Sequence, residues 1–184
     1  MEGNNLNNEN KISKNKIRIF VDGSRDSNCG FSTIAYNIQD GVIINKKFVR
    51  LDFIHNKHFA KRIDCDSPFS AEIDAIELGF NVFRSCVNFN SLFKKLPVRV
   101  KSDAIFAVKY ITKKKITEGF EFDDTQLHKM DLLHIQYKCL RTLYPNFELS
   151  FIPSKNNLAH YNAYEKLKWE RALYFDNKVG VENG

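Results

Sequence analysis

The sequence of 184 residues lacks the features that mark several classes of protein. Its four cysteines, at positions 29, 65, 86 and 139, include no Cys-x-x-Cys pair, which argues against a zinc site and favours reduced thiols in a cytoplasmic protein. No apolar run approaches the length that crosses a membrane, and the first residues have no apolar core of the signal-peptide kind. There is also no internal repeat and no interior linker.

What the chain does contain is typical of one soluble globular domain. Hydrophobic residues make up 43% and charged residues 27%, and the length suffices to bury a core without disulfides. The net charge of +6 favours a polyanionic partner, although a generic basic surface has the same balance. We expect a disordered tail over residues 1–15, a monomeric domain over residues 16–178 and a flexible C-terminus over residues 179–184.

The clearest pattern lies at residues 17–24, where a strand ends on an acid. Residues 17–21 are mostly β-branched or aromatic, which is typical of a buried strand. The strand stops at Asp22-Gly23, a turn signal. Asp22 alone need only start a turn, so its interest depends on whether other acids occupy equivalent positions.

The rest of the chain predicts a mixed α/β sheet covered by helices. Strands over 31–39 and 42–52, joined by a hairpin at Asp40-Gly41, complete an antiparallel meander with the first strand. Further strands are expected over 97–102 and 147–152. The expected helices begin at Ser67-Pro68 and then cover residues 104–115, 124–143 and 157–176. The polar connection 53–68 predicts no regular element.

Two further acids occupy positions comparable with that of Asp22. Asp103 follows the strand 97–102, where it could also be a helix N-cap. Glu72 lies beside the apolar stripe of the helix that begins at Ser67-Pro68, so it faces the sheet. Functional groups collect at the ends of central strands, and three converging acids repel one another without a cation. Because hard oxygen ligands select Mg²⁺ or Mn²⁺, the pattern indicates a divalent metal site.

Four short motifs, in order within about residues 16–169, carry a family resemblance. They are Phe20-Val21-Asp22-Gly23-Ser24, Ser70-Ala71-Glu72-Ile73, Ser102-Asp103 and Ile152–His160. Together they resemble the type 1 ribonuclease H family. The resemblance implies an α/β ribonuclease H-like fold with a five-stranded mixed sheet, antiparallel over the first three strands and parallel thereafter. It also implies two Mg²⁺ or Mn²⁺ ions on Asp22, Glu72 and Asp103, and endonucleolytic hydrolysis of the RNA strand of RNA–DNA hybrids, which leaves 3′-hydroxyl and 5′-phosphate ends.

The chain departs from this family at the fourth acidic position, which His160 occupies. A neutral imidazole binds transition metals but is a poor ligand for Mg²⁺. His160 can therefore be a metal ligand, a proton-transfer group or a packing residue, and these roles stay open. The loop before the last helix is also too short to supply the histidine that many members carry there.

The resemblance places nucleic-acid contacts at two further groups of residues. Polar contacts to the hybrid are expected at Gly23, Ser24, Asn28 and Ser70, and backbone contacts at Lys109, Lys113, Lys114 and Lys115. A solvated helix end is the alternative for these lysines. Two other functions remain open, namely a nuclease of the same fold acting on double-stranded RNA or branched DNA, and a non-catalytic hybrid-binding module with a site decayed at His160.

Overall fold

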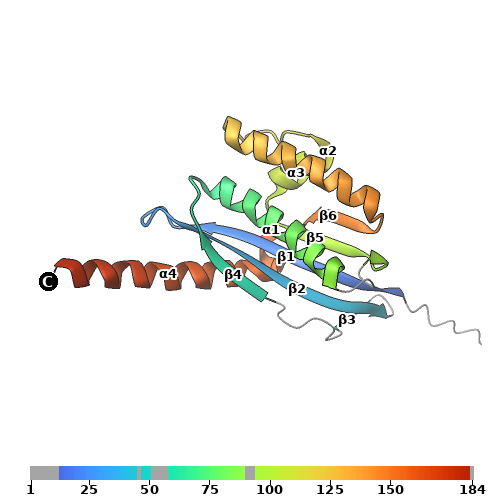
Figure 1. The fold of residues 1–184 in the computed structure, drawn as a ribbon, viewed down its shortest axis with the longest axis horizontal. Helices are drawn as coiled ribbons and strands as arrows, with labels where there is room; N and C mark the ends of the chain where they lie inside the picture. Colours follow the sequence, from blue (N-terminus) through green and yellow to red (C-terminus); the bar gives the residue numbers. More distant parts are fainter. Residues whose placement is uncertain (1–12, 45–46, 51–57, 90–93, 183–184) are drawn as a thin grey trace, which may run out of the picture.

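A mixed sheet lies between helices on both of its faces (Figure 1). The computed structural model describes residues 13–44, 47–50, 58–89 and 94–182. Its strands are β1 (Ser13–Arg25), β2 (Ser32–Ile44), β3 (Lys47–Arg50), β4 (His58–Ile63), β5 (Val98–Ser102) and β6 (Phe147–Phe151). Its helices are α1 (Pro68–Phe89), α2 (Ile105–Lys113), α3 (Asp124–Leu143), the short 3₁₀ helix η2 (Ser154–Asn156) and α4 (Leu158–Glu182).

The strand order β3-β2-β1-β5-β6 is that of the expected five-stranded mixed sheet. β1, β2 and β3 are antiparallel neighbours, whereas β1–β5 and β5–β6 are parallel. β4 pairs with residues 32–37 of β2, and β3 pairs with residues 41–44. β3 and β4 therefore lie one after the other along the same edge of β2.

The predicted hairpin at Asp40-Gly41 is wrong. Asp40 pairs with Ile17 inside a continuous ladder, and β2 runs on to Ile44 before β3 returns. The dipeptide favours a turn only where no neighbouring strand extends past it, and here β1 pairs across it. The predicted strand 42–52 is represented by the end of β2 and by β3, while residues 51–57 lie outside the described residues.

The connection 53–68 also contains a strand that the sequence did not reveal. β4 has mostly exposed side chains, among them His58, Lys61 and Arg62. A polar strand at a sheet edge carries little hydrophobic periodicity, and this is why the pattern did not predict it.

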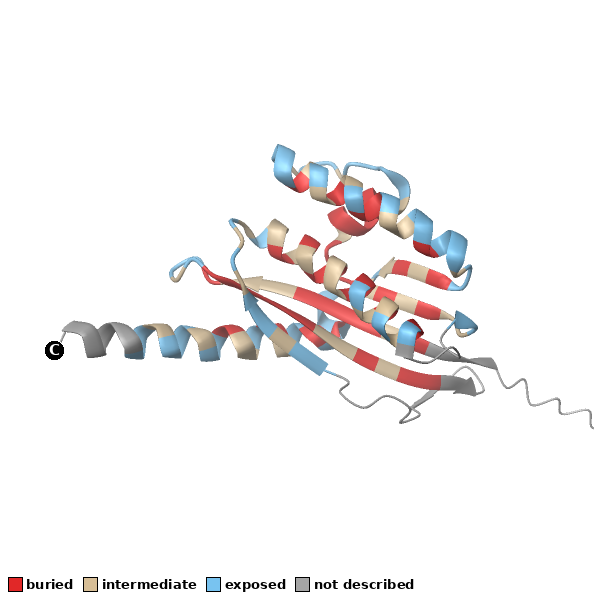
Figure 2. Ribbon diagram, in the orientation of Figure 1, coloured by how far each residue is buried: buried red, intermediate tan, exposed pale blue. Residues whose placement is uncertain are grey.

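The main core lies between the sheet and the helices α1, α2 and α3. Figure 2 shows the buried residues concentrated along β1, β2, β5 and the inner faces of these helices. The predicted stripe of α1 is fully buried at Ile73, Ile76 and Phe80. Ser67 caps α1 as expected, because its Oγ accepts a hydrogen bond of 3.0 Å from the Ser70 N–H.

α4 covers the opposite face of the sheet over a smaller core of Phe20, Ala35, Ala159 and Ala163. Its C-terminal half extends past β4 and beyond the sheet (Figure 1). The helix ends at Glu182, later than the expected residue 176, and β1 begins at Ser13, before the expected start of the domain. Within the described residues, no helix combines the length and the apolar character that crossing a bilayer requires.

Candidate metal centre

Two adjacent strands and one helix bring three of the predicted site residues together. The predicted strand end at Asp22-Gly23 is wrong, because β1 continues to Arg25 in its ladder with β2. Asp22 therefore lies within β1 and is 1% exposed, Asp103 directly follows β5, and His160 lies in the first turn of α4. One potential ligand atom from each residue lies within 4.8 Å of the others. The parallel pairing of β1 with β5 explains the meeting of the two aspartates, because Phe20 pairs with Lys101 and each aspartate lies two residues further along the chain.

Glu72 reaches this centre because β1 and α1 approach closely at Gly23. A Cβ added at Gly23 would overlap the carbonyl of Ala71 and lie 2.7 Å from the Glu72 nitrogen. Only glycine fits such an approach, and the Gly23 N–H donates a hydrogen bond to the Glu72 carboxylate. Glu72 lies outside the group of ligand atoms within 4.8 Å, although it acts electrostatically on Asp22.

The carboxylate of Asp103 is not used as a helix cap. The N-cap of α2 is Ala104, which has no side-chain cap, and the Ala104 N–H donates instead to Ser102 Oγ at 3.1 Å. The capping alternative for Asp103 is therefore wrong. Ser102 is buried and takes over the local hydrogen bond, so the Asp103 carboxylate turns towards Asp22.

Asn157 joins the two aspartates, a role that the sequence pattern did not indicate. Its Nδ2 donates hydrogen bonds to Asp103 Oδ1 at 2.8 Å, to the Val21 carbonyl at 2.9 Å and to Asp22 Oδ1 at 3.3 Å. The residue is 5% exposed. Asn157 lies within the motif at 152–160, but nothing local distinguishes its amide from the neighbouring Asn156. Only the tertiary structure shows that one amide orients both carboxylates.

The electrostatics of the centre favour a cation. Burial, followed by the charges of Glu72 and Asp103, raises the pKa of Asp22 well above its ordinary value, while a hydrogen bond with Ser24 opposes this shift. Burial and then Asp103 likewise raise the pKa of Glu72. Asp22 Oδ2 and Glu72 Oε2 are buried and accept no hydrogen bond within the described residues. Such orphaned oxygens fit a divalent metal, since a cation offsets both their burial and their mutual repulsion.

His160 is placed differently from the carboxylates. Its Nδ1 lies 3.3 Å from Asp22 Oδ2, yet 55% of its side chain is exposed. The ring thus borders the centre from the solvent side. This position suits a ligand or a proton-transfer group, while so exposed a ring contributes little to packing.

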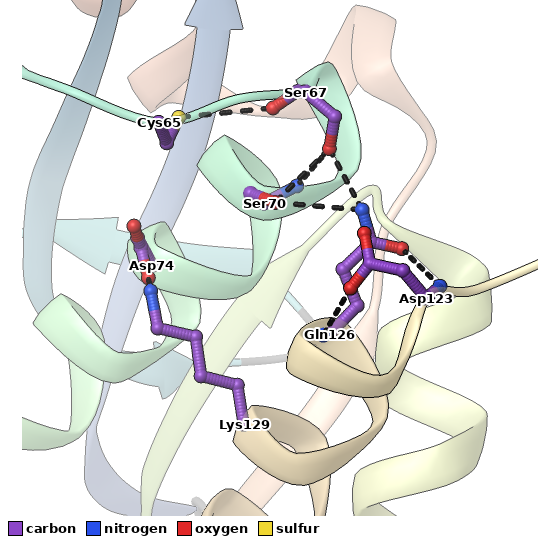
Figure 3. A network of polar contacts seen from close by, with 7 residues as sticks. All are labelled: Cys65, Ser67, Ser70, Asp74, Asp123, Gln126 and Lys129. Atoms are coloured by element: carbon purple, nitrogen blue, oxygen red, sulfur yellow. Dashed lines mark hydrogen bonds and ion pairs between the residues drawn. The ribbon is translucent and has the colours of Figure 1, made fainter.

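The predicted polar contacts to nucleic acid surround the centre unequally. Ser24 is half-buried beside Asp22, and Asn28 is exposed in the turn between β1 and β2. Ser70 instead belongs to a polar network between α1 and α3 (Figure 3). Its Oγ lies 3.0 Å from Ser67 Oγ, and Gln126 Nε2 donates to both hydroxyls, at 2.8 Å to Ser67 and at 3.4 Å to Ser70.

The predicted lysines also differ in their surroundings. Lys114 is the left-handed C-cap of α2, with φ of 55°, and its Nζ pairs with Asp131. Lys113 and Lys115 are exposed beside it, and Lys109 is half-buried on α2. The ion pair with Asp131 gives Lys114 a structural contact that its two neighbours lack within the described residues.

Searches of protein-family models and of curated proteins found no match to this chain. Among solved structures, the LC11 ribonuclease H1 in complex with an RNA/DNA hybrid is similar, with a TM-score of 0.58 and 20% identity over 85% of this chain and 99% of that one. The ribonuclease H1 of Halobacterium salinarum superposes with a TM-score of 0.53 and 15% identity over 83% and 98%. The N-terminal ribonuclease H domain of a Mycobacterium tuberculosis protein gives 0.55 and 15% over 86% and 98%.

The chain has a ribonuclease H-like fold. This confirms the fold predicted from the motifs, including the mixed sheet with its parallel β1–β5–β6 half. At sequence identities of 15–20%, these similarities establish the fold and nothing more.

Proposed function

We propose that this protein is a metal-dependent endoribonuclease that hydrolyses the RNA strand of RNA–DNA hybrids. The observation that carries the proposal is the pair of buried, orphaned oxygens of Asp22 and Glu72 beside Asp103. Buried carboxylate oxygens that accept no hydrogen bond are costly, and a cation site is the arrangement that compensates them. The complex of the LC11 neighbour with an RNA/DNA hybrid supports this choice of substrate class.

Asp22, Glu72 and Asp103 are the residues that would hold two Mg²⁺ or Mn²⁺ ions. Such ions, when bound, act as Lewis acids on a phosphodiester and lower the pKa of a water. The chain itself supplies the geometry. Asn157 fixes the orientation of both aspartates through hydrogen bonds of 2.8 and 3.3 Å. Gly23 admits Glu72 to the end of β1.

His160 serves this reaction either as a nitrogen ligand or by transferring a proton. Its Nδ1 is adjacent to Asp22 Oδ2, and its exposed ring can exchange a proton directly with solvent. Both roles use the same position, so substitution and metal preference must separate them.

The hybrid is expected to lie across the end of β1, the β1–β2 turn and the first turn of α1. Ser24 and Asn28 offer polar groups suited to 2′-hydroxyls and phosphates, and the lysines at 109 and 113–115 suit the DNA backbone. The Ser70 hydroxyl would bind the hybrid from within its network with Ser67 and Gln126. The monomeric state and the cytoplasmic location expected from the sequence stay predictions.

A cleavage assay tests this function. The protein is incubated with a hybrid, a double-stranded RNA and a branched DNA, first with Mg²⁺ and then with Mn²⁺, with Asp22→Asn as the inactive control. Cleavage of the hybrid RNA strand that leaves 3′-hydroxyl and 5′-phosphate ends supports the proposal. Preference for duplex RNA or for the junction favours the other nucleases of this fold. Absence of cleavage, together with absence of Mn²⁺ binding by calorimetry, favours a non-catalytic module.

A further inference from the structure

The turn between β1 and β2, residues 26–31, lies against the C-terminal half of α4 (Figure 1). The Asp26 N–H donates to the Phe31 carbonyl, and the Gly30 N–H donates to the Asp26 carbonyl, both at 3.0 Å. Gly30 has a φ of +73°, which a residue with a side chain rarely adopts. Asn28, one of the predicted contacts to nucleic acid, lies exposed within this closed turn.

One carboxylate connects the turn to α4. Asp26 Oδ1 accepts hydrogen bonds from the backbone N–H groups of Asn28, at 2.8 Å, and Cys29, at 3.0 Å. Asp26 Oδ2 lies 3.6 Å from a guanidinium nitrogen of Arg171, and the Asp26 side chain is only 7% exposed. Burial opposes the charge, but the two N–H groups and then Arg171 lower the pKa of Asp26. The carboxylate is therefore ionised in the folded protein.

Neighbouring contacts hold α4 in place for this ion pair. The Phe31 and Tyr174 rings lie 6.3 Å apart. Arg62 of β4 lies over the Phe31 ring at 4.4 Å and 3.8 Å from Glu170 of α4. Thr33 Oγ1 also donates a 2.8 Å hydrogen bond to the Ala163 carbonyl. α4 is thus attached to the sheet at Ala163 and Glu170, before Arg171, and contacts the turn itself at Tyr174, after Arg171.

We propose that Arg171 is a positioning residue for substrate binding, which acts through Asp26 to fix the turn that presents Asn28 to the nucleic acid. Without Arg171, one oxygen of a buried carboxylate loses its counter-charge, and the turn becomes easier to open. Substrate binding must then supply the free energy that orders the turn, so the affinity for the substrate falls. Asp26 and Arg171 lie outside the metal centre, so the rate of the bound complex stays the same. This inference rests on the proposed function.

The test compares Arg171→Ala, Arg171→Lys and Lys168→Ala in hybrid cleavage with Mn²⁺. Lys168 is the matched control, since it is an exposed cation on the same helix whose partner is Glu165 rather than the turn. Arg171→Ala should raise KM about fivefold with kcat unchanged, the effect expected of a partly exposed ion pair. Arg171→Lys should restore KM to within about twofold, and Lys168→Ala should leave it unchanged.

A second measurement needs no nucleic acid. Amide hydrogen exchange at Asn28 and Cys29 in the free protein should become several-fold faster in Arg171→Ala and stay unchanged in Lys168→Ala. Unchanged exchange in Arg171→Ala overturns the inference, as does an equal rise of KM in Lys168→Ala. A wild-type protein that neither binds nor cleaves a hybrid contradicts the proposed function instead, and the exchange data separate the two failures.

Discussion

Two carboxylate oxygens of the centre, Asp22 Oδ2 and Glu72 Oε2, are buried where no hydrogen bond reaches them within the described residues. Asp103 adds a third negative group, and Asn157 supplies one amide to two acids. Each charge is tolerable only if a proton or a metal ion accompanies it. Protons and metal ions therefore compete for the same oxygens, and the properties of the site depend on both.

Neutralising one aspartate should abolish the activity. We expect Asp22→Asn and Asp103→Asn each to reduce hybrid cleavage about a thousandfold, because losing a metal ligand forfeits several kcal/mol of transition-state stabilisation. The fold should persist, since asparagine fills the same volume. Steady-state cleavage at saturating Mn²⁺ measures the loss, and circular dichroism checks the fold. Turnover close to that of the wild type would remove the substituted residue from the set of metal ligands.

The raised pKa values of Asp22 and Glu72 predict an unusual dependence of stability on pH. A group whose pKa is higher in the folded than in the unfolded state stabilises the protein while it is protonated. That contribution is complete below the unfolded pKa of about 4 and is lost as pH rises towards the folded pKa. The metal-free protein should therefore lose stability between pH 5 and pH 7, by up to about 1.4 kcal/mol per pH unit and group.

Urea denaturation in the presence of a chelator measures this dependence. Asp22→Asn should flatten it and should stabilise the metal-free protein at pH 7, because the neutral asparagine is buried without taking up a proton on folding. Added Mn²⁺ should restore stability to the wild type far more than to the variant. A wild-type stability that rises from pH 5 to pH 7 without metal would contradict the assigned electrostatics.

The metal preference should reveal the role of His160. If its imidazole is a ligand, the wild type should prefer Mn²⁺, which accepts nitrogen and irregular coordination more readily than Mg²⁺ does. His160→Asp should then shift the preference towards Mg²⁺, because it restores a carboxylate. Turnover of both proteins across concentrations of each metal gives the comparison. Parallel curves would exclude a ligand role, and a loss of rate without a change in preference would indicate proton transfer.

Among the elements, β1 and α1 form the contact on which the position of Glu72 depends. Gly23→Ala would place a methyl group against the backbone of Ala71 and Glu72, which cannot rotate away. We expect a loss of about 1–3 kcal/mol in the free energy of unfolding, together with weaker Mn²⁺ binding.

Gly79→Ala in α1 is the control. Its added Cβ would lie 2.8 Å from side-chain methyl groups of Val21 and Val100 rather than against backbone. It should cost stability with little effect on metal affinity, so equal metal affinities in all three proteins would contradict the role of Gly23.

Some elements could be predicted because their signals are local, while others depend on distant partners. The limits of α3 match the predicted residues 124–143, and the cap at Ser67 is where the sequence placed it. Asp40-Gly41 misled because the ladder with β1, far away in the sequence, outweighs its turn preference. β4 was missed for a related reason. It is held at the edge of the sheet by its pairing with β2, so its own side chains need no hydrophobic pattern.

The same division applies to the site. Asp22 and Asp103 were predictable because each directly follows a run that predicts a strand, and the parallel pairing of β1 with β5 brings the two positions together, although β1 itself continues past Asp22 to Arg25. Asn157 was not, because its role depends on three acceptors that lie more than fifty residues earlier in the chain. The sequence alone placed Lys114 in one group with Lys113 and Lys115. In the structure Lys114 differs from these neighbours, because it forms an ion pair with Asp131 of α3.

At the scale of the whole molecule, the net charge of +6 makes ionic strength the broadest test of nucleic-acid binding. Contacts to phosphates release counterions, so the logarithm of the affinity for a hybrid should fall linearly with the logarithm of the salt concentration. Fluorescence anisotropy in a chelator measures this slope without cleavage. A flat titration would exclude a surface that follows the phosphate backbone.

Substitution of single lysines shows which part of the surface produces this salt dependence. Lys113→Ala and Lys115→Ala should each reduce it by about one if the side chain contacts a phosphate. Lys114→Asn removes the same charge from the same turn, and asparagine tolerates the left-handed backbone at this position. Because Lys114 already pairs with Asp131, its loss should change the slope less than the loss of either neighbour. Equal changes in all three variants would mean that the hybrid responds to the overall charge of this end of α2, and the individual phosphate contacts assigned to Lys113 and Lys115 would then be wrong.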